Sequence, residues 1–443
     1  MSGLVARNGG RLGLAALAAI LLLSFALRVD YAWEGRAPVF DAVAYGEIAR
    51  NLDDGNGFTL GEQATQPASN YSPGLPLLVA GLYKLSGGEH ERFARVVLAL
   101  IGALSVLFAY LIARRLSGPF AGLVGASAVA VYPALLEYQG MLMGEPLAAT
   151  LLSGAVLSML WAAGQARARW LVPGLLLGAL ALLRPEYLGI SLLLAAVVVA
   201  LDRSKWRTGL LNAAVLPVGV VLLVAPWTVR NAVALDRFVP VSTGGGQVLF
   251  AGTYLPSDGD PEQVGSEVVE RNPELFEPSD IERLRLEQIL ARLAAQRYPD
   301  LPSDEALGRM GREQLWDDLT EQPTEYAGFV ATKVWRIWSH GPREVMERPI
   351  WEIFHWALLA LALLGFVVLT LRCNVLSAHE RDKTLHRWEA LLLATLFVSI
   401  TAISALLVAS PRRVLVMLPL VAALAGVGAT ACRDSLARRW HRS

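Results

Sequence analysis

Charged residues are scarce in this sequence. They make up 18% of the 443 residues, whereas about a quarter of a soluble domain is charged, and 54% of the residues are hydrophobic. Basic and acidic residues number 39 each, so the chain lacks the basic excess that nucleic-acid-binding proteins carry. The composition therefore predicts an all-α polytopic membrane protein with membrane lipids around it and no nucleic-acid partner.

Patterns for metal, disulfide and nucleotide sites are also sparse. Two cysteines, Cys373 and Cys432, exclude a disulfide-rich scaffold and a multi-cysteine zinc or iron–sulfur site. The six histidines show no HExxH spacing. A glycine run at residues 244–246 could hold an anion on its backbone N–H groups, but no Gly-Lys-Ser/Thr follows it. We expect no nucleotide cofactor.

Ten apolar stretches approach the roughly 20 residues that a helix needs to cross the hydrocarbon core. They cover residues 12–29, 96–113, 119–136, 146–166, 170–183, 187–201, 208–229, 354–371, 390–410 and 414–432. The first continues past any small-residue cleavage site, so we interpret it as a retained helix. The two short stretches around Arg184-Pro185-Glu186 are interpreted as helices joined by a tight turn, because one continuous helix would bury an Arg and a Glu in lipid.

Basic residues indicate the orientation of these spans. With a cytoplasmic N-terminus, the inner segments hold 17 basic and 5 acidic residues, which agrees with the positive-inside rule. Only four of the 39 basic residues are lysine, a bias that points to a GC-rich bacterial genome. The sequence thus predicts a multi-pass protein of the bacterial inner membrane. We divide it into residues 1–229, an outward segment 230–352, and residues 353–443.

Two acidic residues stand where outward segments begin helices. Asp41 is placed to cap a short helix, and Glu145 starts a long uncharged run behind Pro146. Capping alone could explain either acid. Four polar outward turns at one depth, however, would bring both acids to one face of the protein, which is how a site assembles.

One outward turn breaks the positive-inside pattern. Arg412 and Arg413 follow Ser410-Pro411 at a helix start, where basic residues also oppose the helix dipole. Lipid phosphate is the anion at that depth. In another outward turn, the simplest interpretation of Arg184-Pro185-Glu186 is a solubilising ion pair.

The segment 230–352 is predicted to be helical. Ser279-Asp280-Ile281-Glu282 has the pattern of a capping box opening a helix to about residue 297, and a second helix is expected over 303–319. Residues 324–338 form an amphipathic pattern with Lys333 and Arg336 flanking its apolar side. We expect a small external domain with outward juxtamembrane helices.

Short motifs follow one another in order along most of the chain. They are Asp41 with Tyr45, Tyr71-Ser72-Pro73-Gly74-Leu75-Pro76, Glu145-Pro146-Leu147, Arg184-Pro185-Glu186, Pro226-Trp227 with Arg230-Asn231, Ser242-Thr243-Gly244-Gly245, and Arg412-Arg413 before Leu418-Pro419-Leu420. This ordered set resembles one known family, the GT-C glycosyltransferases, in particular the group of dolichyl-phosphate-mannose:protein mannosyltransferase and aminoarabinose transferase. One departure is Ala42, where the family often has a second acid. The external segment is also shorter than in several relatives.

The resemblance implies a GT-C-type bundle of about ten spans. It also implies transfer of a hexosyl or pentosyl group from a polyprenyl-phosphate donor to an extracytoplasmic glycan, lipid or protein, with inversion. Asp41 would be the base, and Glu145 would orient the acceptor or, with Asp41, hold a divalent metal such as Mg²⁺ or Mn²⁺. The donor phosphate would bind Arg184, Arg230, Arg412 or Arg413, and the pocket would include Tyr45, Tyr71 and Glu186.

Two other functions fit parts of the pattern. A lipid-linked-sugar flippase would place ionisable groups near the membrane midplane, whereas these spans are almost free of charge, with Arg28 and His355 near span ends. A surface-polysaccharide ligase or polymerase would also use outward arginines and a long outer loop, but it leaves Asp41 without a role.

Overall fold

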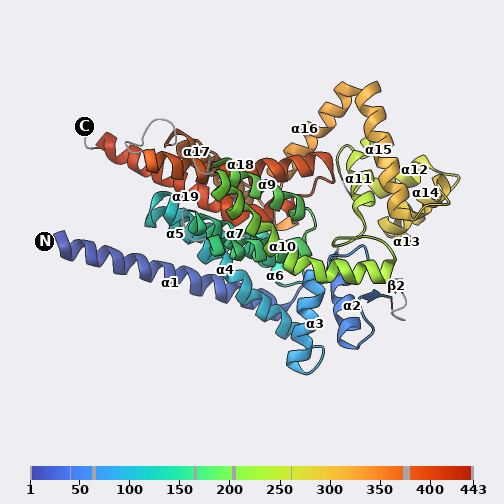
Figure 1. Ribbon diagram of the computed structural model, residues 1–443, viewed down its shortest axis with the longest axis horizontal. Helices are drawn as coiled ribbons and strands as arrows, with labels where there is room; N and C mark the ends of the chain where they lie inside the picture. The colour runs from blue at the N-terminus through green and yellow to red at the C-terminus, as the bar shows by residue number, and fades with distance from the viewer. Residues whose placement is uncertain are drawn as a thin grey trace.

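The computed structural model describes residues 2–39, 41–61, 66–163, 167–201, 206–260, 262–372 and 380–440. The described residues are almost wholly helical and form an elongated molecule (Figure 1). A bundle of long helices occupies one side, and a group of shorter helices lies beyond the opposite end of the bundle. α1 begins and α19 ends at the same end of the bundle, away from that group.

All ten predicted apolar stretches fall on helices of the bundle. Its helices are α1 (Ser2–Glu34), α4 (Glu91–Ser117), α5 (Pro119–Val131), α6 (Pro133–Gln139), α7 (Glu145–Ala162), α8 (Leu171–Leu183), α9 (Tyr187–Leu201), α10 (Trp206–Leu235), α17 (Pro349–Leu371), α18 (Glu380–Leu406) and α19 (Arg412–Trp440). Seven helical segments in the described residues are long and apolar enough to cross a membrane. The count is below ten because α4 and α5 form one segment and α8 and α9 are short. The protein is a multi-pass membrane protein.

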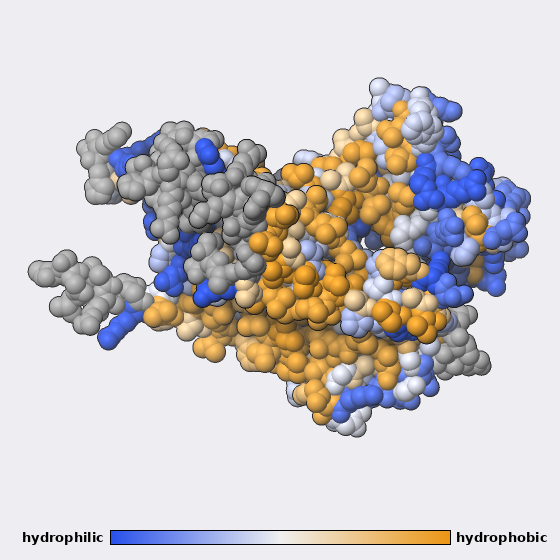
Figure 2. All heavy atoms as spheres, in the orientation of Figure 1, coloured by the Kyte–Doolittle hydropathy of each residue, from blue (hydrophilic) through white to orange (hydrophobic). Residues whose placement is uncertain are grey.

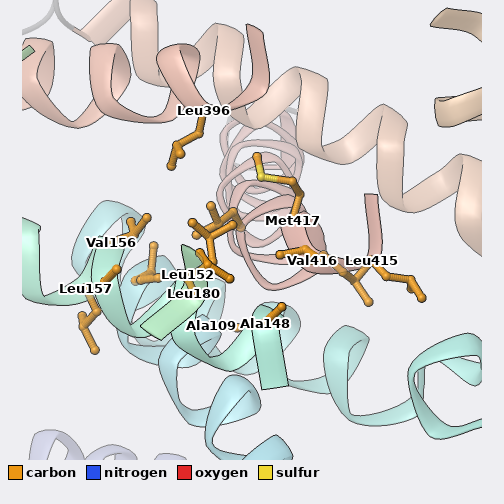
Figure 3. Packing of buried hydrophobic residues seen from close by; sticks show 14 of the residues in the cluster. Ala109, Ala148, Leu152, Val156, Leu157, Leu180, Leu396, Leu415, Val416 and Met417 are labelled. Atoms are coloured by element: carbon orange, nitrogen blue, oxygen red, sulfur yellow. The ribbon is translucent and has the colours of Figure 1, made fainter. Parts of the chain in front are cut away.

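The centre of the bundle is α19, which packs against α4, α5, α7 and α17. In its most apolar stretch 89% of the residues are buried, against 11% for α1. Small residues allow this packing: a Cβ on Gly428 would lie 2.1 Å from the Leu361 carbonyl oxygen of α17. Figure 3 shows Met417 of α19 among Leu152, Leu180 and Leu396, which come from three other helices.

The outer elements come from two parts of the chain. The first outer loop contains α2 (Asp41–Asp53), the antiparallel strands β1 (Thr59–Leu60) and β2 (Gln66–Pro67), and α3 (Gly74–Ser86); Thr59 pairs with Pro67 and Leu60 with Gln66. The later segment contains α11 (Gly245–Thr253), α12 (Val264–Arg271), α13 (Asp280–Arg283), α14 (Leu286–Arg297), α15 (Ser303–Glu321) and α16 (Pro323–Ser339). Three 3-10 turns, η1 (Arg167–Trp170), η3 (Leu255–Ser257) and η4 (Glu344–Glu347), join other elements.

Surface chemistry separates the bundle from the later outer helices. Figure 2 shows a hydrophobic surface along the bundle and a hydrophilic one over α11–α15. The latter helices enclose a small core of their own around Phe250, Val268 and Leu290. The domain boundaries at residues 229 and 352 remain predictions.

Two local expectations were wrong. Ser279 makes no capping hydrogen bond, α13 is only four residues long, and the main helix α14 begins later, at Leu286. Lys333 was expected at the flank of an amphipathic helix, yet it is 1% exposed. Of the cysteines, Cys432 is an exposed free thiol. Cys373 lies outside the described residues.

Candidate active site

Three helices and one turn meet in a cluster of two carboxylates and two arginines, which we call the acid–arginine cluster: Asp41, Glu145, Arg184 and Arg412. Arg412, the first residue of α19, donates from Nη2 to Asp41 Oδ2 at 3.0 Å and from Nε to Glu145 Oε1 at 2.6 Å. Arg184, in the turn between α8 and α9, donates from Nη2 to the same Glu145 oxygen at 2.6 Å. The structure therefore brings together residues up to 371 positions apart.

Backbone contacts fix the two acids relative to each other. α5 ends before Pro133, and the chain turns through α6 to Gly140 before α7 begins at Glu145. The Arg36 N–H, in the link from α1 to α2, donates to the Gly140 carbonyl at 2.8 Å. A Cβ on Gly140 would lie 2.9 Å from the Tyr31 carbonyl oxygen, so the close approach requires glycine. This contact joins the segment that leads to Asp41 to the one that leads to Glu145.

The two acids differ in their access to solvent. The Glu145 side chain is 0% exposed, whereas that of Asp41 is 39% exposed. Glu145 Oε2 is buried without a hydrogen-bond partner in the described part of the chain. Two carboxylates face two guanidinium groups, so the cluster is neutral as a unit. Asp41 is the acid that a molecule arriving from outside can reach.

Two tyrosines form one wall beside Asp41. Tyr45, one turn after Asp41 on α2, meets the Tyr71 ring edge-on with centroids 6.0 Å apart. Burial and the charge of Asp41 raise the pKa of Tyr45, and burial and Glu287 raise that of Tyr71, so both hydroxyls keep their protons near neutral pH. The Tyr71 hydroxyl donates to Glu287 Oε1 at 3.1 Å.

Glu287 contacts the tyrosine wall of the site, and the sequence did not indicate it as a site residue. It lies in the first turn of α14, where an acid is ordinary helix chemistry. Its contact with Tyr71 spans 216 positions in the chain, and nothing near either residue indicates it.

Arg413 contacts groups outside the acid–arginine cluster. Its Nη1 donates to the Val408 carbonyl oxygen, and its Nε lies 3.7 Å from Glu186 without a hydrogen bond. The expected ion pair within Arg184-Pro185-Glu186 is therefore replaced by two longer-range pairs, because Arg184 bonds to Glu145 and Glu186 faces Arg413.

Arg230 stands apart on an aromatic surface near the end of α10. Its guanidinium lies 4.9 Å from the Trp227 ring centre and 5.7 Å from that of Phe58, and it donates to Asn231 Oδ1 at 3.1 Å. Asn231 is fixed in turn by the carbonyls of residues 239 and 241. Within the described residues no acidic side chain pairs with Arg230. Tyr71 packs against the same aromatic group.

The glycine run does bind an anion, but the anion is part of the protein. The N–H groups of Gly246 and Gln247 donate to Asp304 Oδ1 at 2.9 and 3.3 Å. A Cβ on Gly246 would lie 1.8 Å from the Asp304 carbonyl oxygen. The run therefore joins α11 to α15 and is closed to a substrate phosphate.

Asp41 and Glu145 do not make a metal site by themselves. Arg412 is bonded to both, and cationic guanidinium groups occupy the positions at which a divalent ion would need those oxygens. The described residues hold no group of three or more His, Cys, Asp or Glu side chains that could bind a metal.

Comparisons with known proteins bear on the fold of the chain. Residues 69–229 match the family model described as dolichyl-phosphate-mannose-protein mannosyltransferase. The apo oligosaccharyltransferase of Archaeoglobus fulgidus superposes over 97% of this chain and 52% of its own, with a TM-score of 0.56 and 15% identity. The chain has the GT-C fold. The resemblance seen in the sequence is confirmed at the level of fold.

Two further solved structures also match this chain. The same oligosaccharyltransferase in complex with Zn and sulfate gives a TM-score of 0.56 at 14% identity over 96% of this chain and 50% of its own. ArnT from Cupriavidus metallidurans bound to undecaprenyl phosphate gives a TM-score of 0.42 at 16% identity, over 94% of this chain and 77% of its own. This chain thus spans about half the length of the oligosaccharyltransferase. No curated protein sequence matches it.

Proposed function

We propose that this GT-C protein is a glycosyltransferase that moves a hexosyl or pentosyl group from a polyprenyl-phosphate donor to an extracytoplasmic acceptor. The acid–arginine cluster carries the proposal, since it places an accessible carboxylate at the end of the bundle that bears the outer loops. We place the protein in the bacterial inner membrane with this end outward, as the basic inner segments require. The acceptor would be a glycan, a lipid or a protein.

Asp41 is the proposed base. It is the exposed acid of the cluster. Arg412 holds its Oδ2, and Oδ1 is the oxygen proposed to accept a hydroxyl proton. Attack by that hydroxyl on the anomeric carbon, opposite the leaving phosphate, inverts the sugar. Glu145 is buried and does not reach an acceptor; it positions Arg184 and Arg412.

Arg230 is the proposed principal ligand of the donor phosphate. Arg184 and Arg412 are already neutralised by carboxylates, whereas Arg230 has no acidic partner in the described part of the chain and lies against the rings of Trp227 and Phe58. A planar guanidinium donates two parallel hydrogen bonds to phosphate and stabilises its charge as the sugar departs.

A divalent metal would have to compete with Arg412 for both carboxylates. Donor phosphate and water would also have to supply most of its ligands. No step of the proposed reaction passes through a metal.

The test compares Asp41→Asn with the parent, both reconstituted in lipid nanodiscs with a polyprenyl-phosphate sugar labelled in the sugar. We expect the variant to bind the donor as the parent does and to transfer sugar to cell-envelope extract about 10²–10⁴ times more slowly. Full transfer by Asp41→Asn would refute the assignment of the base. Translocation of labelled lipid in proteoliposomes without transfer would favour the flippase. Transfer of whole glycans from a lipid diphosphate would favour the ligase.

A further inference from the structure

A hollow of about 460 Å³ opens on the surface of the outer helices, between the end of α14 and the middle of α15. Three of its lining side chains are bonded to one another. The Tyr298 hydroxyl lies 2.6 Å from both carboxylate oxygens of Glu313, and Arg309 Nε donates to Glu313 Oε1 at 3.2 Å. The Arg309 guanidinium also lies 4.6 Å from the centre of the Tyr298 ring. These contacts join α14 to α15 and fix the shape of what we call the 298/316 hollow.

Four other side chains that line the hollow make no hydrogen bond or ion pair within the described residues: Arg297, Arg312, Trp316 and Asp317. Arg312 and Trp316 are four positions apart on α15 and therefore lie on one face of the helix. Trp316 is 69% exposed, although it belongs to the hydrophilic outer part of the molecule (Figure 2). The fold thus leaves an aromatic ring, two guanidinium groups and one carboxylate available to a ligand.

The charges around the 298/316 hollow argue against a polyanion. Three arginines and two carboxylates line it, and Asp318 lies close to Asp317, Glu321 and Glu325, so that further acids gather beside it. A phosphate-rich polymer or an anionic lipid surface would meet these acids. An acyl chain or a peptide helix would need a continuous apolar groove, whereas charged side chains dominate this lining. A neutral ligand rich in hydroxyl groups fits both signs of charge.

We propose that the 298/316 hollow binds a sugar unit of a glycan acceptor. A pyranose ring has an apolar C–H face, which packs on the exposed Trp316 ring, and hydroxyl groups around its edge. Those hydroxyls accept hydrogen bonds from Arg297 and Arg312 and donate one to Asp317. The inference rests on the function proposed above, and it selects the glycan from the three acceptor classes.

Helix α14 connects the 298/316 hollow to the candidate active site. Glu287, in the first turn of α14, accepts the hydrogen bond from Tyr71 in the wall beside Asp41, and Arg297 ends the helix. Residues 287 and 297 lie about 15 Å apart along the helix axis, at 1.5 Å per residue. The hollow therefore holds an inner sugar of the glycan while the end of the glycan reaches Asp41. Contacts with such a remote part of a substrate supply binding energy for the reaction.

The binding test titrates the full-length protein in nanodiscs with maltohexaose, chitohexaose and hexagalacturonic acid, followed by saturation-transfer NMR. We expect a neutral hexasaccharide to bind and Trp316→Ala to weaken its binding roughly tenfold. Trp316→Phe should retain most of the affinity, because it keeps a ring face. Trp335→Ala is the matched control, since Trp335 is 60% exposed but lies on α16 against Trp356, and its binding should equal that of the parent.

Three results of the titration would overturn the inference. The first is a parent protein that binds none of the three hexasaccharides. The second is binding of hexagalacturonic acid alone, unchanged by Trp316→Ala, which would show a site for anions. The third is an equal loss in Trp335→Ala, which would show a general effect of removing an exposed tryptophan.

A transfer assay separates this inference from the proposed function. With cell-envelope glycan extract as acceptor, Trp316→Ala should raise the half-saturating amount of extract about tenfold and leave the donor KM unchanged. Parental half-saturation in Trp316→Ala would overturn the acceptor subsite and leave the proposed function standing. A parent protein that binds a neutral hexasaccharide through Trp316 but transfers no sugar to any acceptor would refute the proposed function and support the hollow as a saccharide site.

Discussion

Arginines at the end of the bundle that bears α2 and α11 divide into two kinds. Arg184 and Arg412 are held by carboxylates in a neutral cluster, whereas Arg230 lies on aromatic rings with no acid beside it in the described residues. The sequence around each of them looked equivalent, since each arginine lies near a helix end in a segment predicted to face outward. Under the proposed function, a neutralised arginine shapes the site and positions the base, whereas an arginine with no acid beside it binds the substrate anion.

The strongest way to break the neutral cluster is Glu145→Gln. It leaves Arg184 without its carboxylate and Arg412 with Asp41 alone, and breaking a buried ion pair costs about 3–5 kcal/mol. We expect a lower unfolding temperature in detergent together with loss of transferase activity. Glu389→Gln is the matched control, because Glu389 is a buried acid paired with Arg115 at the other end of the bundle. A stable Glu145→Gln protein with full activity would contradict the positioning role.

Arg230→Met tests the other side of the comparison. The variant removes a charge that no acid of the described ranges pairs with, and it keeps a flexible apolar stem on Trp227 and Phe58, so we expect little change in unfolding temperature. The KM for the lipid-phosphate donor should rise by about ten- to a hundredfold, because that factor corresponds to the free energy of one hydrogen bond to a charged group. Arg292→Met supplies the control, because Arg292 also lies over an aromatic ring but pairs with Asp280. An unchanged donor KM in Arg230→Met would show that another arginine binds the phosphate.

The sequence predicted much of this fold because the membrane imposes simple rules. Every apolar stretch became a helix, and the turn at Arg184-Pro185-Glu186 was identified because charge is costly in lipid and proline breaks helices. Asp41, Glu145 and Arg412 were identified as site candidates from their places at outward helix starts, and the structure brings these three together.

The remaining features depend on contacts between distant segments. The sequence placed Lys333 at the flank of a helix, because it contains no sign that α11 would cover that position. The glycine run gave no indication that Asp304 would be its anion, 58 residues away. Equally, nothing in the sequence distinguished the neutralised Arg412 from the uncompensated Arg230. Local patterns predict helices and helix ends, whereas pairing of charges is decided by tertiary packing.

Tyr71→Phe is expected to have the smallest effect on stability and activity. It tests the boundary between the acid–arginine cluster and the aromatic surface under Arg230. The Tyr71 ring contacts both Tyr45, beside Asp41, and the aromatic group under Arg230, while its hydroxyl bonds to Glu287 of α14. Phenylalanine keeps the ring contacts and removes the hydrogen bond, so stability should fall by about 0.5–1.5 kcal/mol with donor KM unchanged. Glu287→Gln in a double-mutant cycle should show coupling of the same size. If Tyr71→Phe instead raised donor KM as strongly as Arg230→Met, the hydroxyl would belong to the phosphate site and the two regions would be one.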